Sequence, residues 1–109
     1  MKVLKVEPYQ LPEVKEIDPG LASLQHEVDG WIEATYPFED PVVIICNEEG
    51  KLNGLSYNPK ATILAEILFH NDCIVGDTFV CAHDGEGRSV GLSDAQELAL
   101  RRRLSDLGF

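Results

Sequence analysis

The chain has 109 residues, of which 44% are apolar and 26% are charged, and its formal net charge is −10. This length fits one globular domain over residues 1–109, since domains of about 100–150 residues are the commonest. No run approaches the roughly 20 apolar residues of a membrane-spanning helix, so we expect no membrane association. The acid excess disfavours direct binding to nucleic acid, because affinity for phosphates comes from lysine and arginine.

The N-terminal residues and the cysteines indicate the compartment. Residues 1–8 (MKVLKVEP) lack the long apolar core of a secretory signal, so we expect a cytoplasmic protein. Cys46, Cys73 and Cys81 lie in or beside apolar stretches, which suits small buried thiols in a reducing compartment. We therefore expect no disulfide.

The first third of the chain predicts an antiparallel strand pair followed by a short helix. Residues 2–8 and 13–17 alternate polar and apolar side chains on either side of a turn. Asp18 and Pro19 then have the character of a helix start, with Asp18 as the N-cap. The inner face of this helix is predicted to consist of Leu21, Leu24, Gln25 and Val28.

The middle of the chain predicts two strands, a turn and a second helix. Residues 31–36 and 41–46 are rich in aromatic and β-branched side chains, and the second run is apolar on both faces, which predicts a central strand. The stretch 46–55 (CNEEGKLNGL) is typical of a turn, in which Gly50 would take a positive φ. Asn58 and Pro59 then predict the start of a helix that continues to Phe69.

The last third predicts a strand over residues 72–82 that Gly76 interrupts, a turn, a short edge strand over 88–90 and a long helix. Ser93 and Gln96 form a capping box at the start of this helix. Its buried stripe is predicted to consist of Leu100, Leu104 and Leu107. The whole pattern predicts an α+β fold: a mainly antiparallel, mixed sheet of four to six strands with two or three helices, the long C-terminal helix packed on the sheet.

The order of several short segments resembles one family. These segments are MKVLKVEP, PEVKEID, LASLQHEVDGWIEA, NEEGKLNGLSYN, DCIVGDTFV and GLSDAQ. In this order and spacing they resemble the domain of unknown function 3846 family of small proteins from bacteria, their phages and plasmids. The chain departs from that family's usual form in a longer helical insert at 61–69 and in Asp29, where a second glycine is common. The resemblance implies a small α+β fold and a mobile-element setting, and it supplies no catalytic residues.

Candidate metal ligands and nucleophiles are few. His70, Cys73, Cys81 and His83 are possible zinc ligands, but Cys73 and Cys81 would lie about 26 Å apart along one strand at about 3.3 Å per residue. We therefore expect no metal and no cofactor. Cys81 and His83 would share one strand face, which leaves a small Cys/His enzyme as an alternative, although no anion-hole motif accompanies the pair.

The best-supported hypothesis is a non-catalytic interaction protein of a phage or plasmid, which docks to a protein of the host or of the element, plausibly one of host defence or plasmid maintenance. The candidate partner-binding residues are Trp31, Tyr36, Phe38, Glu39, Asp40, Glu48 and Glu49. The carboxylates among them would attract a basic partner and speed its approach at low salt. A second alternative is a binder of a small, nucleotide-like ligand, with a pocket between helix and sheet. The lining of that pocket would be Trp31, Tyr36, Tyr57 and an arginine.

Overall fold

A computed structural model describes residues 1–36, 41–65 and 73–108. It contains an antiparallel sheet of six strands and three helices, so the predicted α+β class is confirmed. The strands are β1 (Lys2–Val6), β2 (Glu13–Glu16), β3 (Ile32–Thr35), β4 (Val42–Asn47), β5 (Thr78–His83) and β6 (Ser89–Val90). The helices are α1 (Leu21–Val28), α2 (Pro59–Ala65) and α3 (Asp94–Asp106).

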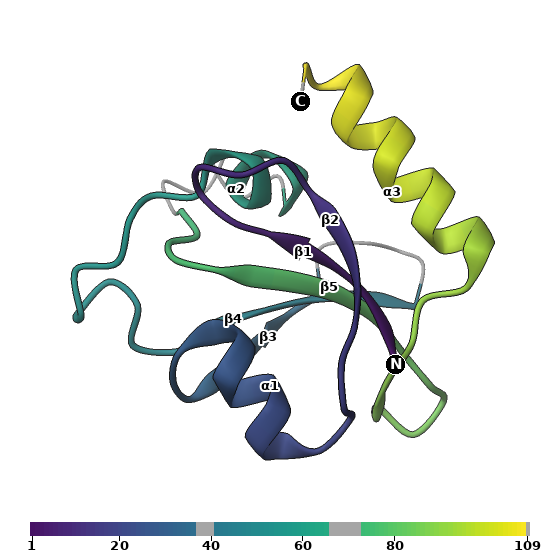
Figure 1. Ribbon diagram of the computed structural model, residues 1–109, viewed down its shortest axis with the longest axis horizontal. Helices are drawn as coiled ribbons and strands as arrows, with labels where there is room; N and C mark the ends of the chain where they lie inside the picture. Colours follow the sequence, from purple (N-terminus) through teal and green to yellow (C-terminus); the bar gives the residue numbers. More distant parts are fainter. Residues whose placement is uncertain (37–40, 66–72, 109) are drawn as a thin grey trace.

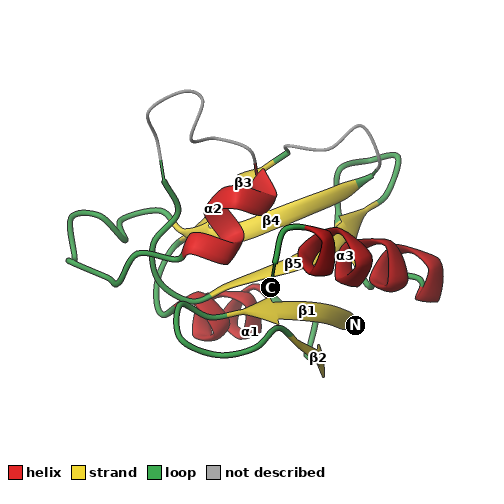
Figure 2. Cartoon of the chain, turned by 90° about the horizontal axis from the view of Figure 1, so that it is seen from above, coloured by secondary structure: helices red, strands yellow, loops and turns green. Residues whose placement is uncertain are grey.

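The sheet lies between two helical layers. Helix α1 covers one face, and α2 and α3 lie over the other (Figure 1). The strand order is β2-β1-β5-β4-β3, with β6 paired to β5, and Figure 2 shows this order from above. All six residues of β4 are buried, which confirms the prediction of a central strand, since β4 lies between β5 and β3.

Each sheet face has its own apolar core. The core under α2 and α3 includes Leu4, Val6, Ile44, Leu64, Val80, Leu100 and Leu104. The core under α1 includes Val3, Leu24, Val28, Val43, Ile45, Phe79 and Cys81. Alternate residues of β4 and β5 serve opposite cores, because successive side chains of a strand point to opposite faces.

Asn58 joins three parts of the chain. Its side chain is fully buried, and Nδ2 donates to the carbonyl oxygens of Val6 and Gly76, both at 2.9 Å. Its Oδ1 accepts from the N–H of Ala61 at 3.1 Å, as an N-cap residue does, which confirms the predicted start of α2. The same amide therefore fixes the end of β1, the segment before β5 and the first turn of α2.

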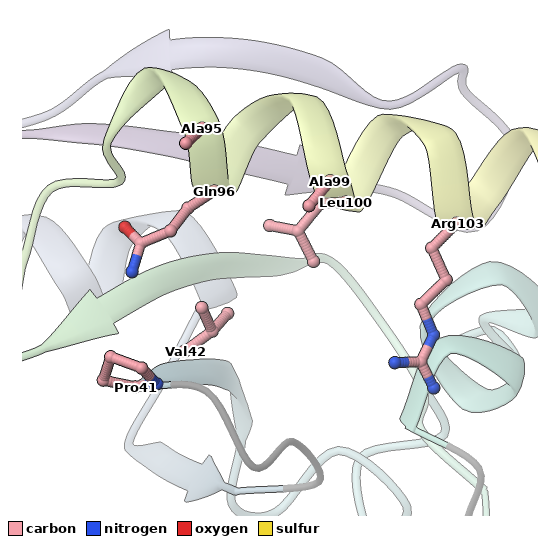
Figure 3. A pocket seen from close by; sticks show the side chains of 7 residues that line it. All are labelled: Pro41, Val42, Ala95, Gln96, Ala99, Leu100 and Arg103. Carbon is pink, nitrogen blue, oxygen red and sulfur yellow. The ribbon is translucent and has the colours of Figure 1, made fainter.

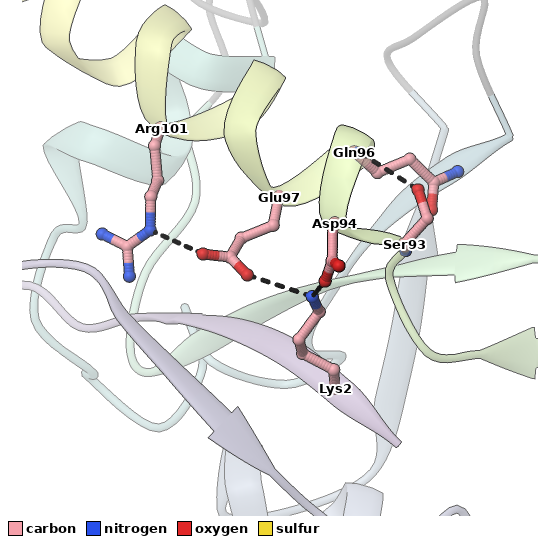
Figure 4. A network of polar contacts seen from close by, with 6 residues as sticks. All are labelled: Lys2, Ser93, Asp94, Gln96, Glu97 and Arg101. Carbon is pink, nitrogen blue, oxygen red and sulfur yellow. Dashed lines mark hydrogen bonds and ion pairs between the residues drawn. The ribbon is translucent and has the colours of Figure 1, made fainter.

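Two sets of polar contacts at the start of α3 set its position. The capping box is confirmed: Ser93 Oγ accepts from the N–H of Gln96 at 3.1 Å, and Gln96 Oε1 accepts from the N–H of Ser93 at 2.8 Å. Lys2 Nζ of β1 lies 2.5 Å from an Asp94 carboxylate oxygen and 3.1 Å from a Glu97 oxygen (Figure 4). These contacts tie the first turns of α3 to the start of the chain.

Helix α1 is held by Glu27, a buried carboxylate that pairs with two lysines and was not predicted from the sequence. Glu27 is 6% exposed, and its carboxylate oxygens lie 2.7 Å from Lys5 Nζ and 2.7 Å from Lys15 Nζ. Lys5 Nζ also donates to the Glu27 carbonyl oxygen at 2.6 Å. Burial alone would raise the pKa of Glu27, but the hydrogen bonds from Lys15 and Lys5 outweigh it and hold the pKa below its ordinary value of 4.5.

Two predictions for the helices are wrong in detail. Helix α1 begins at Leu21 with Gly20 as N-cap, because the Asp18 carboxylate instead accepts from the N–H of Gly20 at 2.8 Å in a separate turn. Leu21, which was predicted to lie on the inner face, is exposed, whereas Glu27 is buried. Leu107 is 42% exposed because α3 ends at Asp106 and Leu107 is its C-cap.

The predicted interruption at Gly76 is confirmed, but the predicted strand over residues 72–82 is wrong for the described residues before this glycine. Strand β5 begins only at Thr78, because Gly76 has a φ of 76° and donates its N–H to the Ser56 carbonyl oxygen at 2.6 Å. Val75 forms an isolated bridge with Tyr57 instead of joining the sheet. The separation of Cys73 and Cys81 predicted along one strand therefore does not apply. The predicted end of α2 at Phe69 lies outside the described residues.

We expect Leu100→Ala and Leu104→Ala each to lower the free energy of unfolding by about 2–5 kcal/mol, because both side chains are buried between α3 and the sheet. Denaturant unfolding at constant pH measures this change. Leu98→Ala is the matched control on the same helix, since Leu98 is 49% exposed, and we expect a change within about 0.5 kcal/mol. Equal stability of all three variants and the unchanged protein would contradict the packing of α3.

We expect acid to weaken the contact between α1 and the strand pair. A carboxyl whose folded-state pKa is lowered stabilises the fold above its unfolded pKa, and this stabilisation is lost as the pH falls through the folded pKa. The melting temperature of Glu27→Gln should therefore lie well below that of the unchanged protein at neutral pH, and this difference should narrow as the pH falls below 4.5, the ordinary pKa of a glutamate. Glu13→Gln, an exposed carboxyl on β2, is the control. A gap that stays constant with pH would contradict this account.

Candidate partner-binding edge

Strand β3 is one edge of the sheet. Its partner is β4, with Glu33 opposite Cys46 and Thr35 opposite Ile44. The Glu48 N–H donates to the Trp31 carbonyl oxygen at 2.8 Å, which fixes the alternation of this antiparallel ladder. Glu33 and Thr35 therefore direct their backbone N–H and C=O groups toward β4. The corresponding groups of Ile32 and Ala34 point away from the sheet, and no described strand pairs with them.

The two exposed aromatic residues of the predicted partner-binding set lie at opposite ends of β3. Trp31 is 63% exposed and Tyr36 is 58% exposed. The Tyr36 ring makes an edge contact with the His83 ring of β5, with centroids 5.3 Å apart and an interplanar angle of 81°. This contact places Tyr36 on the face that α1 covers. Phe38, which belongs to the same predicted set, lies outside the described residues.

The acidic part of the predicted set lies at the same edge. Glu48 and Glu49 are exposed where β4 ends, across the ladder from Trp31. The sequence analysis missed Glu33, an exposed carboxylate within β3 that the alternation of residues 31–36 could have indicated. Glu39 and Asp40 lie outside the described residues.

Asn47 fixes the turn that carries these carboxylates. Its side chain is 6% exposed, and Nδ2 donates to the carbonyl oxygens of Val28 and Asp29, both at 3.0 Å. Its Oδ1 accepts from the N–H of Glu49 at 2.8 Å. The turn is therefore attached to the end of α1. Asp29 has a φ of 59°, the left-handed conformation that ends this helix.

Gly50 has a different role from the predicted one. It does not take a positive φ, which Gly54 does instead at 68°. A Cβ at position 50 would lie 2.8 Å from Val75 Cγ2, so only glycine allows the turn to pack on the segment before β5. The 48–52 turn is thus held between Asn47 on one side and Val75 on the other.

A groove of about 330 Å³ lies beside β3, on the face that α2 covers. Its lining includes Glu33, Thr35, Cys46, Glu48, Lys51 and Cys73. Two carboxylates and a single lysine therefore line the groove, so its net charge is negative, like that of the whole chain.

A second pocket, of about 260 Å³, lies between α3 and the start of β4 (Figure 3). Its lining is Pro41, Val42, Ala95, Gln96, Ala99, Leu100 and Arg103. An arginine is present between helix and sheet, as the small-ligand hypothesis requires. Trp31, Tyr36 and Tyr57, the aromatic residues predicted to line such a pocket, are not among the residues that line this one.

Cys81, the nucleophile of the predicted Cys/His pair, lies in the core of the sheet. Cys46 and Cys81 are buried thiols, as predicted, and Cys73 is partly exposed. Cys81 is fully buried, and burial raises its pKa to about 11, so its thiolate is scarce near neutral pH. Within residues 1–36, 41–65 and 73–108, no group of three or more potential ligands could hold a metal ion. His70, one of the four predicted zinc ligands, lies outside these ranges, so the metal-free state stays a prediction.

The described helices are too short or too polar to cross a membrane. The sequence model of one family, described as a domain of unknown function (DUF3846), matches residues 1–105. The chain therefore belongs to this family, which confirms the resemblance. Comparisons with curated proteins and with solved structures found no match.

Proposed function

We propose that this member of the domain of unknown function 3846 family is a non-catalytic interaction protein that docks to a protein partner through the edge of β3. The observation that carries the proposal is the exposure of Trp31 and Tyr36 at the two ends of an open edge strand. Tryptophan and tyrosine are the residues most enriched among those that dominate binding energy at protein interfaces. These two side chains flank outward backbone groups with which no described strand pairs.

The carboxylates around this edge supply the electrostatic part of the proposal. Glu33, Glu48 and Glu49 surround β3, and the chain as a whole carries a net charge of −10. Complementary charge raises the rate of association with a basic partner and loses this effect as salt rises. We infer that the partner presents a basic surface, and that in a phage or plasmid setting it belongs to the host's defence or to maintenance of the element.

The small-ligand alternative has weaker support. The pocket beside Arg103 has a volume of about 260 Å³, below the range of about 300–1,000 Å³ that is common for ligand sites. Its lining is mostly apolar, and no aromatic side chain is present to stack on a base. A nucleotide that raised the melting temperature, and lost this effect in Arg103→Ala, would favour this alternative.

We expect the double variant Trp31→Ala, Tyr36→Ala to lose the captured partner in a pull-down from host lysate at low salt. A buried aromatic residue at an interface contributes about 2 kcal/mol, or roughly 30-fold in affinity. Capture by the unchanged protein should also weaken when Glu48 and Glu49 are both changed to Gln, or when salt is raised.

The matched control is Tyr9→Ala, which removes an 81% exposed aromatic residue from the turn between β1 and β2, far along the sheet from β3. Its capture should equal that of the unchanged protein. A partner that is retained by the double variant but lost in the control would place docking elsewhere and contradict the proposal.

A further inference from the structure

We propose that the outer edge of β3 binds an extended, basic segment of the partner as an added antiparallel strand. This inference rests on the docking function proposed above and adds the conformation and the charge of the occupant. In this mode of recognition, main-chain hydrogen bonds provide affinity, and alternate side chains provide specificity.

The backbone of β3 has the hydrogen-bonding groups that such a strand needs. The ladder between β4 and β5 gives an independent check of their direction, because the His83 N–H donates to the Pro41 carbonyl oxygen at 3.0 Å. Alternation along β4 then directs Val43 and Ile45 toward β5, and Ile44 and Cys46 toward β3. Both ladders therefore indicate that Ile32 and Ala34 each direct one backbone N–H and one C=O away from the sheet.

The two edges of the sheet differ in a way that points to β3. The opposite edge strand, β2, has the sequence EVKE, and its charged residues protect it from pairing with other chains. The β3 sequence is IEAT, with one charge and no proline, between two exposed aromatic residues. Strand β6, which pairs only with β5, has just two residues, and a very short edge strand is itself protected from pairing. Among the described strands of four or more residues, β3 is therefore the edge without the usual protection.

Side chains beside β3 set the pattern of the added strand. Glu33 points to the face that α2 covers, where it lines the groove, and a residue directly opposite in a non-hydrogen-bonded pair would lie about 4.5 Å away between Cα atoms. Lysine or arginine fits that place. Ile32 packs partly against the core under α1, and the small side chain of Ala34 leaves room beside it for an apolar residue. The occupant therefore alternates basic and apolar residues.

Charge also separates this occupant from a second copy of the chain. Each copy carries a net charge of −10, and pairing two β3 strands in the register centred on Glu33 would place this carboxylate opposite its own equivalent, whereas the register centred on Ala34 would place it opposite Thr35. Like charges directly opposite destabilise a strand pair. A basic segment has neither penalty.

The probe that tests the inference is the peptide acetyl-Lys-Val-Lys-Val-Lys-Val-amide. Trp31 is the single tryptophan of the chain, so its emission reports binding at this edge. We expect a saturable change in emission, weaker at high salt, and at least a 10-fold weaker response to the same peptide with glutamate in place of lysine. Glu33→Lys should reverse this preference.

Backbone methylation then tests strand addition itself. Valines opposite Ile32 and Ala34 would direct their N–H groups toward β3, so N-methylation of the valines should weaken binding at least 10-fold. N-methylation of the lysines, whose N–H groups would point away, is the matched control with the same charge and should leave binding within about threefold. Equal effects of the two methylations would overturn strand addition.

Ala34→Pro tests the protein side of the same contact. It removes an outward N–H and leaves the bonds to β4, which edge positions tolerate, and its melting curve shows whether the fold is kept. Lost peptide binding in a folded Ala34→Pro supports the inference. If the lysate partner depends on Trp31 and Tyr36 but not on Ala34→Pro, and methylation has no position dependence, docking stands and strand addition fails. If self-association is lost in Ala34→Pro instead, the occupant is a second copy. If no variant changes capture, the proposed function fails.

Discussion

The buried side-chain amide of Asn58 is the contact on which the arrangement of this sheet and its edge depends. It bonds to Val6 at the end of β1 and to Gly76 before β5, and it caps α2. The backbone groups that bond to this amide are buried. Removing the amide would therefore leave them unpaired, at a cost of about 1–3 kcal/mol for each group. Through Val75, on which Gly50 packs, this contact also supports the turn that carries Glu48 and Glu49.

A second asparagine extends the same principle to the candidate site. Asn47 attaches the end of α1 to the exit of β4, so the acidic turn is held from both faces of the sheet. Among the described strands, β3 pairs only with β4, and its outward backbone groups are presented on a frame that β4 fixes. A rigid frame with open hydrogen-bonding groups favours binding, since little conformational entropy is lost when an extended segment is added. Burial of Cys81, by contrast, raises the pKa of its thiol and disfavours it as the nucleophile of a Cys/His pair.

The sequence predicted the helices and strands better than the residues at which they begin and end. Alternation and β-branched runs identified the β1–β2 pair and the buried β4, and the capping box located the start of α3. The helix-start pattern at Asp18 was misleading, because its carboxylate bonds to the Gly20 N–H in a separate local turn. Gly76 was expected to interrupt the strand over 72–82, but local patterns could not show that Val75 and Gly76 contact Tyr57 and Ser56 instead of joining the sheet. They could not show the burial of Glu27 either, which depends on lysines of two other strands. Trp31, Tyr36, Glu48 and Glu49 were predicted as candidate partner-binding residues, the carboxylates and the aromatic patch as alternatives, and only the strand order brings them to one edge and adds Glu33.

The central claim is that β3 presents an open edge, and amide hydrogen exchange measured residue by residue tests it most directly. The account predicts that in the free protein the Ile32 and Ala34 amides exchange much faster than those of Glu33 and Thr35, which bond to β4. On addition of the lysine–valine peptide, the two fast amides should become protected. Equal protection of all four amides in the free protein, or bound peptide without added protection at Ile32 and Ala34, would contradict it.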